Sequence, residues 1–310
     1  MGMFPPKSSF VNINGIRIHY LDWGGDGPAL VFLTGMGCSA YIFGQFAPRF
    51  TDNFHVLALD RRGHGDSDCP ETGYDPDTLT DDLRQFLDAL GIEKAILAGH
   101  SMAYVELCHF TVLYPERVLK LVFLDAAYED YLPENNAVWE KNPLPKIMPG
   151  WPEEFRGTID EYIVEIKRRF PPLAAVWTKV MDEQTRHVFE ETLDGKVVDK
   201  MSDAISKAIN NTFASYVPEY SKLRVPVLSF FADRDGTDFL SSDFMTEEQR
   251  AQVLDFFRSV LQPDRKRYYK EFQRKVPHAR VIVIPKGNHY CFLGQEGIVY
   301  EEMRRFLSIL

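Results

Sequence analysis

Short apolar runs alternate along this chain with longer segments whose apolar residues recur at helical spacing. Helical spacing covers residues 77–90, 102–113 and 297–310, and each of these segments would bury one face. The apolar runs have the length of buried parallel strands and lie at 29–33, 56–59, 95–98, 119–124, 227–231 and 281–284. Strands that alternate with helices in this way predict an α/β fold with a doubly wound, mostly parallel sheet.

An Asn14-Gly15 pair precedes this alternation and separates two short runs, 11–13 and 16–20, in which apolar and polar residues alternate. Asn-Gly suits the two-residue turn of a hairpin, because both turn positions need a positive φ. The sequence therefore predicts an antiparallel hairpin ahead of the first buried strand.

Residues 128–222 interrupt the rhythm of strands and helices. The segment contains no buried-strand run, and its helical patterns cover 159–170, 174–193 and 197–214. We interpret it as a helical cap inserted into a core that is made of residues 1–127 and 223–310. A shorter insertion, 236–276, includes a further helical pattern at 247–261.

Composition narrows the class of partner. The 310 residues are 45% hydrophobic, and the formal net charge is −10. That charge disfavours nucleic acid and anionic membranes, because phosphate binding needs clustered lysines and arginines. The chain has no apolar stretch approaching the ~18 residues of a membrane span, residues 1–6 do not resemble a signal peptide, and its cysteines lack Cys-x-x-Cys spacing. We expect a cytoplasmic protein that acts on a small molecule without a metal or organic cofactor, and the oligomeric state stays open.

The run at 95–98 leads directly into Gly99-His100-Ser101-Met102-Ala103 and then into a helical segment. A serine on such a sharp strand-to-helix turn projects its hydroxyl above the sheet, and small residues two positions before and after it let strand and helix approach closely. A serine that merely caps the helix is the alternative. The glycine two residues earlier favours a nucleophile elbow, with Ser101 as the nucleophile.

A serine hydroxyl needs a base, and the base needs an orienting acid. His289 follows the strand-like run 281–284 in a glycine-containing loop, so it would lie at the same edge of the sheet as Ser101. Two carboxylates, Asp233 and Asp235, follow the run 227–231, and Asp125 follows the run 119–124. We predict Asp235 as the acid, with Asp233 in reserve and Asp125 as a further alternative.

The remaining requirement is a site for the oxyanion. Thr34-Gly35-Met36-Gly37 follows the run 29–33, and backbone amides in such a turn can face a developing negative charge. A second donor would be the amide of Met102, the residue after the nucleophile. The chain order of serine, acid and histidine is typical of the elbow arrangement.

These segments resemble the α/β-hydrolases, in particular the cap-bearing esterases and C–C hydrolases. Asp60-Arg61-Arg62-Gly63-His64-Gly65-Asp66-Ser67 is similar to the family's D-x-R-G-x-G-x-S loop, and Tyr114-Pro115-Glu116-Arg117-Val118 follows the elbow helix as in the family. The Gly287-Asn288-His289 segment fits the same pattern. The resemblance implies a triad of Ser101, His289 and Asp235, oxyanion donors at the amides of Met36 and Met102, and a lid over the site.

The chain departs from the family pattern close to the site. Thr34 stands where a histidine is usual, and Ala232 replaces a glycine near the acid. Ala103 replaces the last elbow glycine and would require a slightly wider approach of helix and strand. Tyr104 puts a large ring beside the elbow, which would narrow the pocket or bring a hydroxyl near the substrate.

We expect a serine hydrolase of the carboxylesterase type that cleaves esters of small to medium apolar substrates through an acyl-enzyme. A serine at the elbow disfavours chemistry that needs a carboxylate nucleophile, as in epoxide hydrolases. Alternatives are a C–C bond hydrolase, whose carboxylate grip would come from Arg168, Arg169 or Arg186, and a receptor with the same fold and little turnover. Perhydrolase or lactonase side activity also stays open. Substrate contacts are expected from Gly35, His100, Tyr104, Trp139 and Trp177.

Overall fold

An eight-stranded sheet forms the centre of the protein, with strand order β1-β2-β4-β3-β5-β6-β10-β11. The computed structural model describes residues 5–127, 138–150 and 154–308. The antiparallel neighbours are β1 with β2 and β2 with β4, and the pairs from β4 to β11 are parallel. The strands are β1 (Lys7–Ile13), β2 (Ile16–Gly24), β3 (Ala29–Leu33), β4 (His55–Leu59), β5 (Ala95–His100), β6 (Val118–Leu124), β10 (Val227–Asp233) and β11 (Arg280–Pro285). The predicted doubly wound, mostly parallel sheet is thus confirmed.

The turn between β1 and β2 has the predicted conformation. Asn14 and Gly15 have φ values of 46° and 73°, which is the pair of positive φ values that a tight hairpin turn requires. The two strands pair antiparallel from Ile13 opposite Ile16 to Lys7 opposite Asp22.

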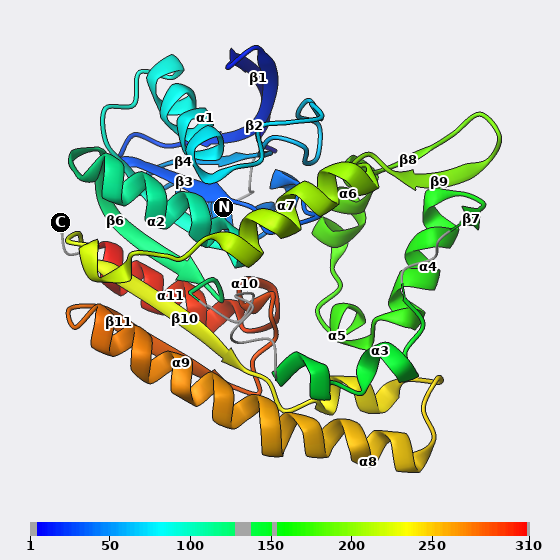
Figure 1. The fold of residues 1–310 in the computed structure, drawn as a ribbon. Coiled ribbons are helices and arrows are strands. Elements are labelled where there is room, and N and C mark those ends of the chain that lie inside the picture. The colour runs from blue at the N-terminus through cyan, green and yellow to red at the C-terminus, as the bar shows by residue number, and fades with distance from the viewer. Residues whose placement is uncertain (1–4, 128–137, 151–153, 309–310) are drawn as a thin grey trace.

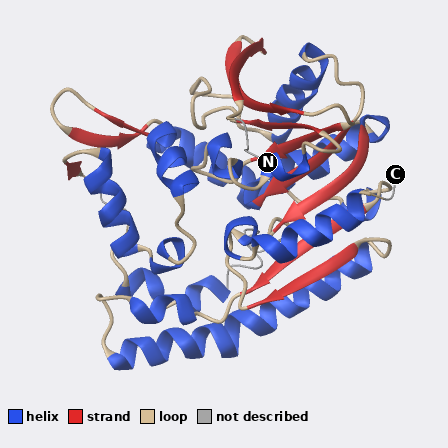
Figure 2. Cartoon of the chain, turned by 180° about the vertical axis from the view of Figure 1, so that it is seen from behind, coloured by secondary structure: helices blue, strands red, loops and turns tan. Residues whose placement is uncertain are grey.

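Helices cover both faces of the sheet (Figures 1 and 2). Neighbouring residues of one strand serve opposite layers: Val31 of β3 packs in one core cluster and Phe32 in the other. The first cluster includes side chains of α1 (Pro76–Ala89), α2 (Tyr104–Leu113) and α9 (Gln262–Lys275). The second includes side chains of α11 (Glu296–Leu307) and of the short helical turn η1 (Ala40–Phe43). The sheet is therefore held rigidly between two apolar layers, and its strand ends provide fixed positions for a site.

Most of the elements between β6 and β10 lie to one side of the large sheet, and the last helix among them, at residues 203–215, runs back and packs in the first core cluster (Figure 1). These elements are α3 (Leu144–Ile147), β7 (Phe155–Arg156), α4 (Ile159–Arg169), α5 (Pro171–Ala174), α6 (Lys179–Val188), β8 (Phe189–Glu191), β9 (Lys196–Asp199) and α7 (Asp203–Ser215). We refer to them as the cap. The domain boundaries at 127/128 and 222/223 stay a prediction, and residues 128–137 fall outside the described ranges.

One part of the cap differs from the expectation. The sequence predicts helices at 174–193 and 197–214, but the structure has a hairpin of β8 and β9, which joins β7 in a three-stranded antiparallel sheet. Gly195 in the connecting turn has a φ of 75°, and the Thr192 hydroxyl accepts a hydrogen bond from the Lys196 amide at 3.0 Å. A glycine in the left-handed region favours a tight turn, and this turn brings the residues on either side of it together as strands rather than as the ends of two helices.

The second insertion is more helical than the sequence suggests. The helix predicted at 247–261 is α8 (Glu247–Phe256) followed by a π-helical segment, Phe257–Leu261, and it continues without a break into α9. Within the described ranges, none of the helices is both long and apolar enough to cross a membrane.

Candidate active site

Ser101 is the first residue after β5, and its backbone is strained. Its φ is 53°, in the left-handed region that non-glycine residues rarely adopt. Gly99 faces the elbow helix so closely that a methyl group added there would lie 2.5 Å from Leu107 and 2.8 Å from the Ala103 methyl. The chain therefore accepts Ala103 at the last elbow position because Gly99 has no side chain. The structure thus has the sharp strand-to-helix turn that the sequence predicts, and the role of Ser101 as nucleophile stays a prediction.

His289 lies in the loop after β11, and its ring is held by Asp125 from the end of β6. His289 Nδ1 donates to Asp125 Oδ2 at 2.7 Å, and the Ala232 amide of β10 donates to Asp125 Oδ1 at 2.7 Å. The Asp125 side chain is 3% exposed, and its backbone φ is 50°. Burial alone would raise the pKa of Asp125, but the hydrogen bond and charge of His289 outweigh it and hold that pKa below its ordinary value.

The expectation that Asp235 orients His289 is wrong. The Asp235 carboxylate accepts hydrogen bonds from the Thr237 amide at 3.0 Å and the Thr237 hydroxyl at 2.6 Å, and it lies 3.9 Å from the Lys286 ammonium. The Asp235 carboxylate therefore stabilises the turn that follows β10. Asp233, the reserve, is the last residue of β10, and burial raises its pKa. Asp125 orients His289 instead. Because β6 lies between β5 and β10 in the sheet, the end of β6 that carries Asp125 is central to the site.

His100 supports the loop that carries His289. It is 1% exposed, its Nε2 donates to the backbone oxygen of His289 at 3.0 Å, and the two ring centroids are 4.6 Å apart. Burial and the neighbouring His289 lower the pKa of His100 well below its usual value, so the ring is neutral. A neutral ring with its proton on Nε2 has a bare Nδ1, and this buried atom has no hydrogen-bond partner among the described residues.

The turn after β3 borders Ser101. A methyl group added to Gly35 would lie 3.1 Å from Ser101 Cβ and 2.8 Å from His100 Nδ1, so only a glycine allows this approach. Thr34 is fully buried, and Gly37 has a φ of 66°. The structure thus brings the predicted oxyanion turn beside the predicted nucleophile. Oxyanion donation by the amides of Met36 and Met102 stays a prediction.

Aromatic residues that the sequence suggests as substrate contacts have well-defined packing partners. The Tyr104 ring is 3% exposed and lies 6.0 Å, centroid to centroid, from Phe213 of α7. Trp177 donates from Nε1 to Asp182 at 2.7 Å, and Trp139 packs with the cluster of apolar residues around α8. Tyr104 therefore connects the elbow helix to the cap. Substrate contact by these rings stays a prediction.

The cap touches the loops of the site directly, which the sequence does not reveal. Asn288, beside His289, donates from Nδ2 to the backbone oxygen of Pro172 in α5 at 2.8 Å. A methyl group added to Gly294 would lie 2.8 Å from Val176, just after α5. Gln184 of α6 accepts a hydrogen bond from the Ser39 amide at 3.1 Å. The cap thus reaches both the histidine loop and the segment after the predicted oxyanion turn.

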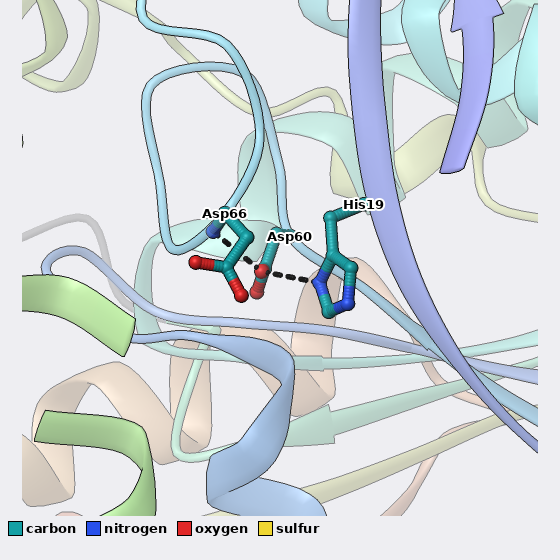
Figure 3. A group of neighbouring side chains, drawn as sticks. All are labelled: His19, Asp60 and Asp66. Carbon is teal, nitrogen blue, oxygen red and sulfur yellow. Dashed lines mark hydrogen bonds and ion pairs between the residues drawn. The ribbon is translucent and has the colours of Figure 1, made fainter. Parts of the chain in front are cut away.

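A cluster of His19, Asp60 and Asp66 has the residue types of a metal site (Figure 3). The atoms that could bind a metal are already engaged in hydrogen bonds and ion pairs within the protein. His19 Nδ1 donates to Asp60 at 2.7 Å, and Asp60 also accepts from the amides of Ala40 and Asp66. Asp66 accepts from His187 of α6 and from the Lys200 ammonium at 2.9 Å. We therefore assign the cluster a structural role at the border of core and cap.

A buried ion pair lies under the elbow helix. Arg61 Nη1 donates to Glu106 Oε1 of α2 at 2.6 Å, and the two side chains are 3% and 2% exposed. Arg61 also contacts the Met102 sulfur, so the pair supports the residue after the predicted nucleophile. Burial raises the pKa of Glu106 although Arg61 opposes this. Burial and then Arg61 lower the pKa of the adjacent His64 to about 3, so His64 is neutral.

Fold and site together define an α/β protein with a strained serine at a sharp strand-to-helix turn and a histidine–aspartate pair at the same sheet edge. The chain belongs to the family described as alpha/beta hydrolase fold, whose model matches residues 28–295. The protein is accordingly a hydrolase of that family.

Among curated relatives, the chain is 26% identical over 261 residues to "Epoxide hydrolase 4" of Mus musculus, which covers 80% of this chain and 70% of that protein. It is 36% identical over 101 residues to "2-(acetamidomethylene)succinate hydrolase" of Mesorhizobium japonicum, with 33% of this chain and 36% of that protein covered. The second match thus spans about a third of either protein.

Among solved structures, the fold is similar to the crystal structure of E-2-(acetamidomethylene)succinate hydrolase, with a TM-score of 0.73. The superposition covers 98% of this chain and 99% of that one at 22% sequence identity. At that identity the likeness concerns the fold alone.

Proposed function

We propose that the protein hydrolyses carboxylic esters through an acyl-enzyme on Ser101. In this proposal Ser101 attacks the acyl carbon while His289 takes its proton and then delivers it to the leaving alcohol. Asp125 holds the imidazole in the tautomer with a proton on Nδ1 and stabilises the cation that forms. The amides of Met36 and Met102 would bind the oxyanion. Water activated by His289 would then release the acid.

The observation that carries the proposal is that a strained serine and an oriented histidine both follow strands of the same sheet. Ser101 has its φ of 53° directly at the end of β5, and His289 Nδ1 is bound to the buried Asp125 at 2.7 Å. A strained backbone at a strand end has a cost that is typically tolerated at functional sites. Ser101 is also not a cap residue, because the N-cap of the helical turn Ser101–Ala103 is His100 and the N-cap of α2 is Ala103.

The serine separates this chain from one kind of chemistry that its relatives suggest. A mouse relative is named as an epoxide hydrolase. Opening an epoxide through a covalent ester intermediate needs a carboxylate nucleophile, and the elbow here presents the hydroxyl of Ser101. We therefore favour acyl transfer.

A second candidate is hydrolysis of a substrate that carries carboxylates, including cleavage of a C–C bond. The relative named as a 2-(acetamidomethylene)succinate hydrolase favours it. The arginines that the sequence suggests as a carboxylate grip argue against it, because each has a protein partner. Arg168 and Arg169 bind Glu165, at 2.9 Å and 2.6 Å, and Arg186 pairs with Asp160. We keep this candidate second.

The test combines labelling with turnover. A fluorophosphonate probe should label Ser101, identified by peptide mass spectrometry, and Ser101→Ala should abolish labelling. A panel of p-nitrophenyl esters of increasing acyl length should give a burst and steady turnover, both lost in Ser101→Ala. Tight, saturable ester binding without turnover would instead support a receptor. Turnover of dicarboxylate C–C substrates in preference to all esters would favour the second candidate.

A further inference from the structure

Helix α6 of the cap lies along the short turn η1, which directly follows the predicted oxyanion segment. The stacked rings of Tyr41 and His187 have centroids 3.7 Å apart, and Val180 would lie 3.3 Å from a methyl group added at Gly44. Met181 is 2% exposed and packs in the same core cluster as Phe43. Val180, Met181, Gln184 and His187 follow helical spacing, so one face of α6 meets this turn.

Gln184 occupies the middle of that face and makes a buried polar contact. Its Oε1 accepts the hydrogen bond of the Ser39 amide at 3.1 Å, and the exposed fractions of Gln184 and Ser39 are 7% and 0%. Ser39 is the N-cap residue of η1, and its own hydroxyl makes no capping hydrogen bond. The next amide, Ala40, donates to Asp60 of the core loop. Two consecutive amides are thus fixed by side chains, one from the cap and one from the core.

This clamp holds one end of the predicted oxyanion segment. β3 fixes the other end at Leu33, and Gly35 is in close contact with Ser101 and His100. A buried backbone amide that loses its acceptor pulls its segment toward another partner, because an unmade buried hydrogen bond is costly. The few residues between Leu33 and Ser39 would then shift, and the Met36 amide with them.

We propose that Gln184 is a positioning residue: through the Ser39 amide it holds the oxyanion segment in its productive geometry, so that the cap completes the catalytic site. The inference rests on the proposed function, since it assumes that the Met36 amide serves an oxyanion. A donor displaced from the developing charge weakens transition-state binding and leaves substrate binding nearly unchanged.

The test uses variants of similar side-chain volume. Gln184→Met keeps the bulk and removes the acceptor, and we expect kcat to fall about 10- to 100-fold with KM changed less than about threefold. The affinity for a trifluoromethyl ketone, whose tetrahedral adduct carries an oxyanion, should fall by a similar factor. Gln184→Glu retains an acceptor and should recover kcat to within a few-fold. Lys179→Met on the exposed side of α6 is the matched control, with unchanged kcat expected.

The outcomes separate the two proposals. If the unaltered protein shows neither fluorophosphonate labelling of Ser101 nor ester turnover, the proposed function is overturned. Suppose the unaltered protein hydrolyses esters. If Gln184→Met then keeps its kcat and its affinity for the ketone, or shows only a higher KM and a lower melting temperature, the inference alone is overturned. If Gln184→Met fails to fold, Gln184→Asn carries the same test, because its shorter amide cannot reach the Ser39 amide.

Discussion

Replacing Asp125 by asparagine tests which carboxylate orients His289. Asparagine has nearly the same shape and tolerates a positive φ, so it suits the backbone φ of 50° at this position. Its carbonyl oxygen can accept from only one of the two partners that Asp125 serves, His289 Nδ1 and the Ala232 amide. If the oxygen stays on Ala232, an NH₂ group faces His289, which then takes the wrong tautomer for accepting the Ser101 proton.

The expected loss is large because the imidazolium formed in turnover also loses a buried counter-charge. The same replacement of the orienting carboxylate in a chymotrypsin-like triad lowers kcat by about 10⁴-fold. We expect a fall of about 10³- to 10⁴-fold here, or roughly 4–5.5 kcal/mol in the activation barrier. The assay is kcat and KM with a short p-nitrophenyl ester, with fluorophosphonate labelling as a second readout.

Asp235→Asn is the matched control. Asparagine can still accept from the Thr237 amide and hydroxyl, and the Lys286 ammonium at 3.9 Å is mostly exposed. We expect less than about a threefold change in kcat, because a surface ion pair of this kind contributes little. The assignment would be refuted if Asp235→Asn abolished turnover while Asp125→Asn stayed within a few-fold of the unaltered protein.

Three further predictions concern the surroundings of the site. Gly99→Ala should lower both the melting temperature and kcat, since the new methyl would lie 2.5 Å from Leu107, whereas the control Gly297→Ala, with open space at that position, should lower neither. Glu106→Gln should reduce the free energy of unfolding in urea by about 3–5 kcal/mol, because it leaves the buried Arg61 charge unpaired; a change below about 1 kcal/mol would contradict this. Burial lowers the pKa of His187, but the hydrogen bond and charge of Asp66 raise it by more, so that pKa is raised in the folded state. Its contribution to stability is therefore full below the ordinary pKa of about 6.5 and is lost as the pH rises through the raised value. The difference in unfolding free energy between the unaltered protein and His187→Gln should therefore be larger below about pH 6.5 than in alkaline solution.

The sequence predicts the parts of the fold that depend on local patterns. Each apolar run became a strand, and Gly99 with Ser101 marks the elbow because the need for a small residue there is local. The choice among acids is of another kind. Asp125 and Asp235 both follow buried strands, and only the position of β6 between β5 and β10, together with the positive φ of Asp125, brings one of them to His289. Strand order and backbone conformation are set by tertiary packing, which a single sequence does not display.

The cap was hardest to predict for a related reason. β8 and β9 are short and partly exposed, so their pattern is weak, and the helical interpretations of 174–193 and 197–214 take in the strand residues on either side of Gly195. The contacts that matter most for the site join residues far apart in the chain, such as Gln184 with Ser39. A glutamine inside an amphipathic helix looks like a surface residue, and its burial at 7% exposure becomes visible only when α6 is packed against η1.

The two unusual residues of the elbow have different consequences. Ala103 lies against Gly99, where the missing side chain leaves room for its methyl, so this departure from the family pattern is absorbed within the elbow itself. Tyr104 instead extends the elbow outward: its ring meets Phe213 and Tyr216 at centroid distances of 6.0 Å. The helix that follows Ser101, α2, is therefore packed against the end of α7. Since α6 also meets the turn after the oxyanion segment, the cap is coupled to both sides of Ser101, and its packing bears on the geometry of the site as well as on access to it.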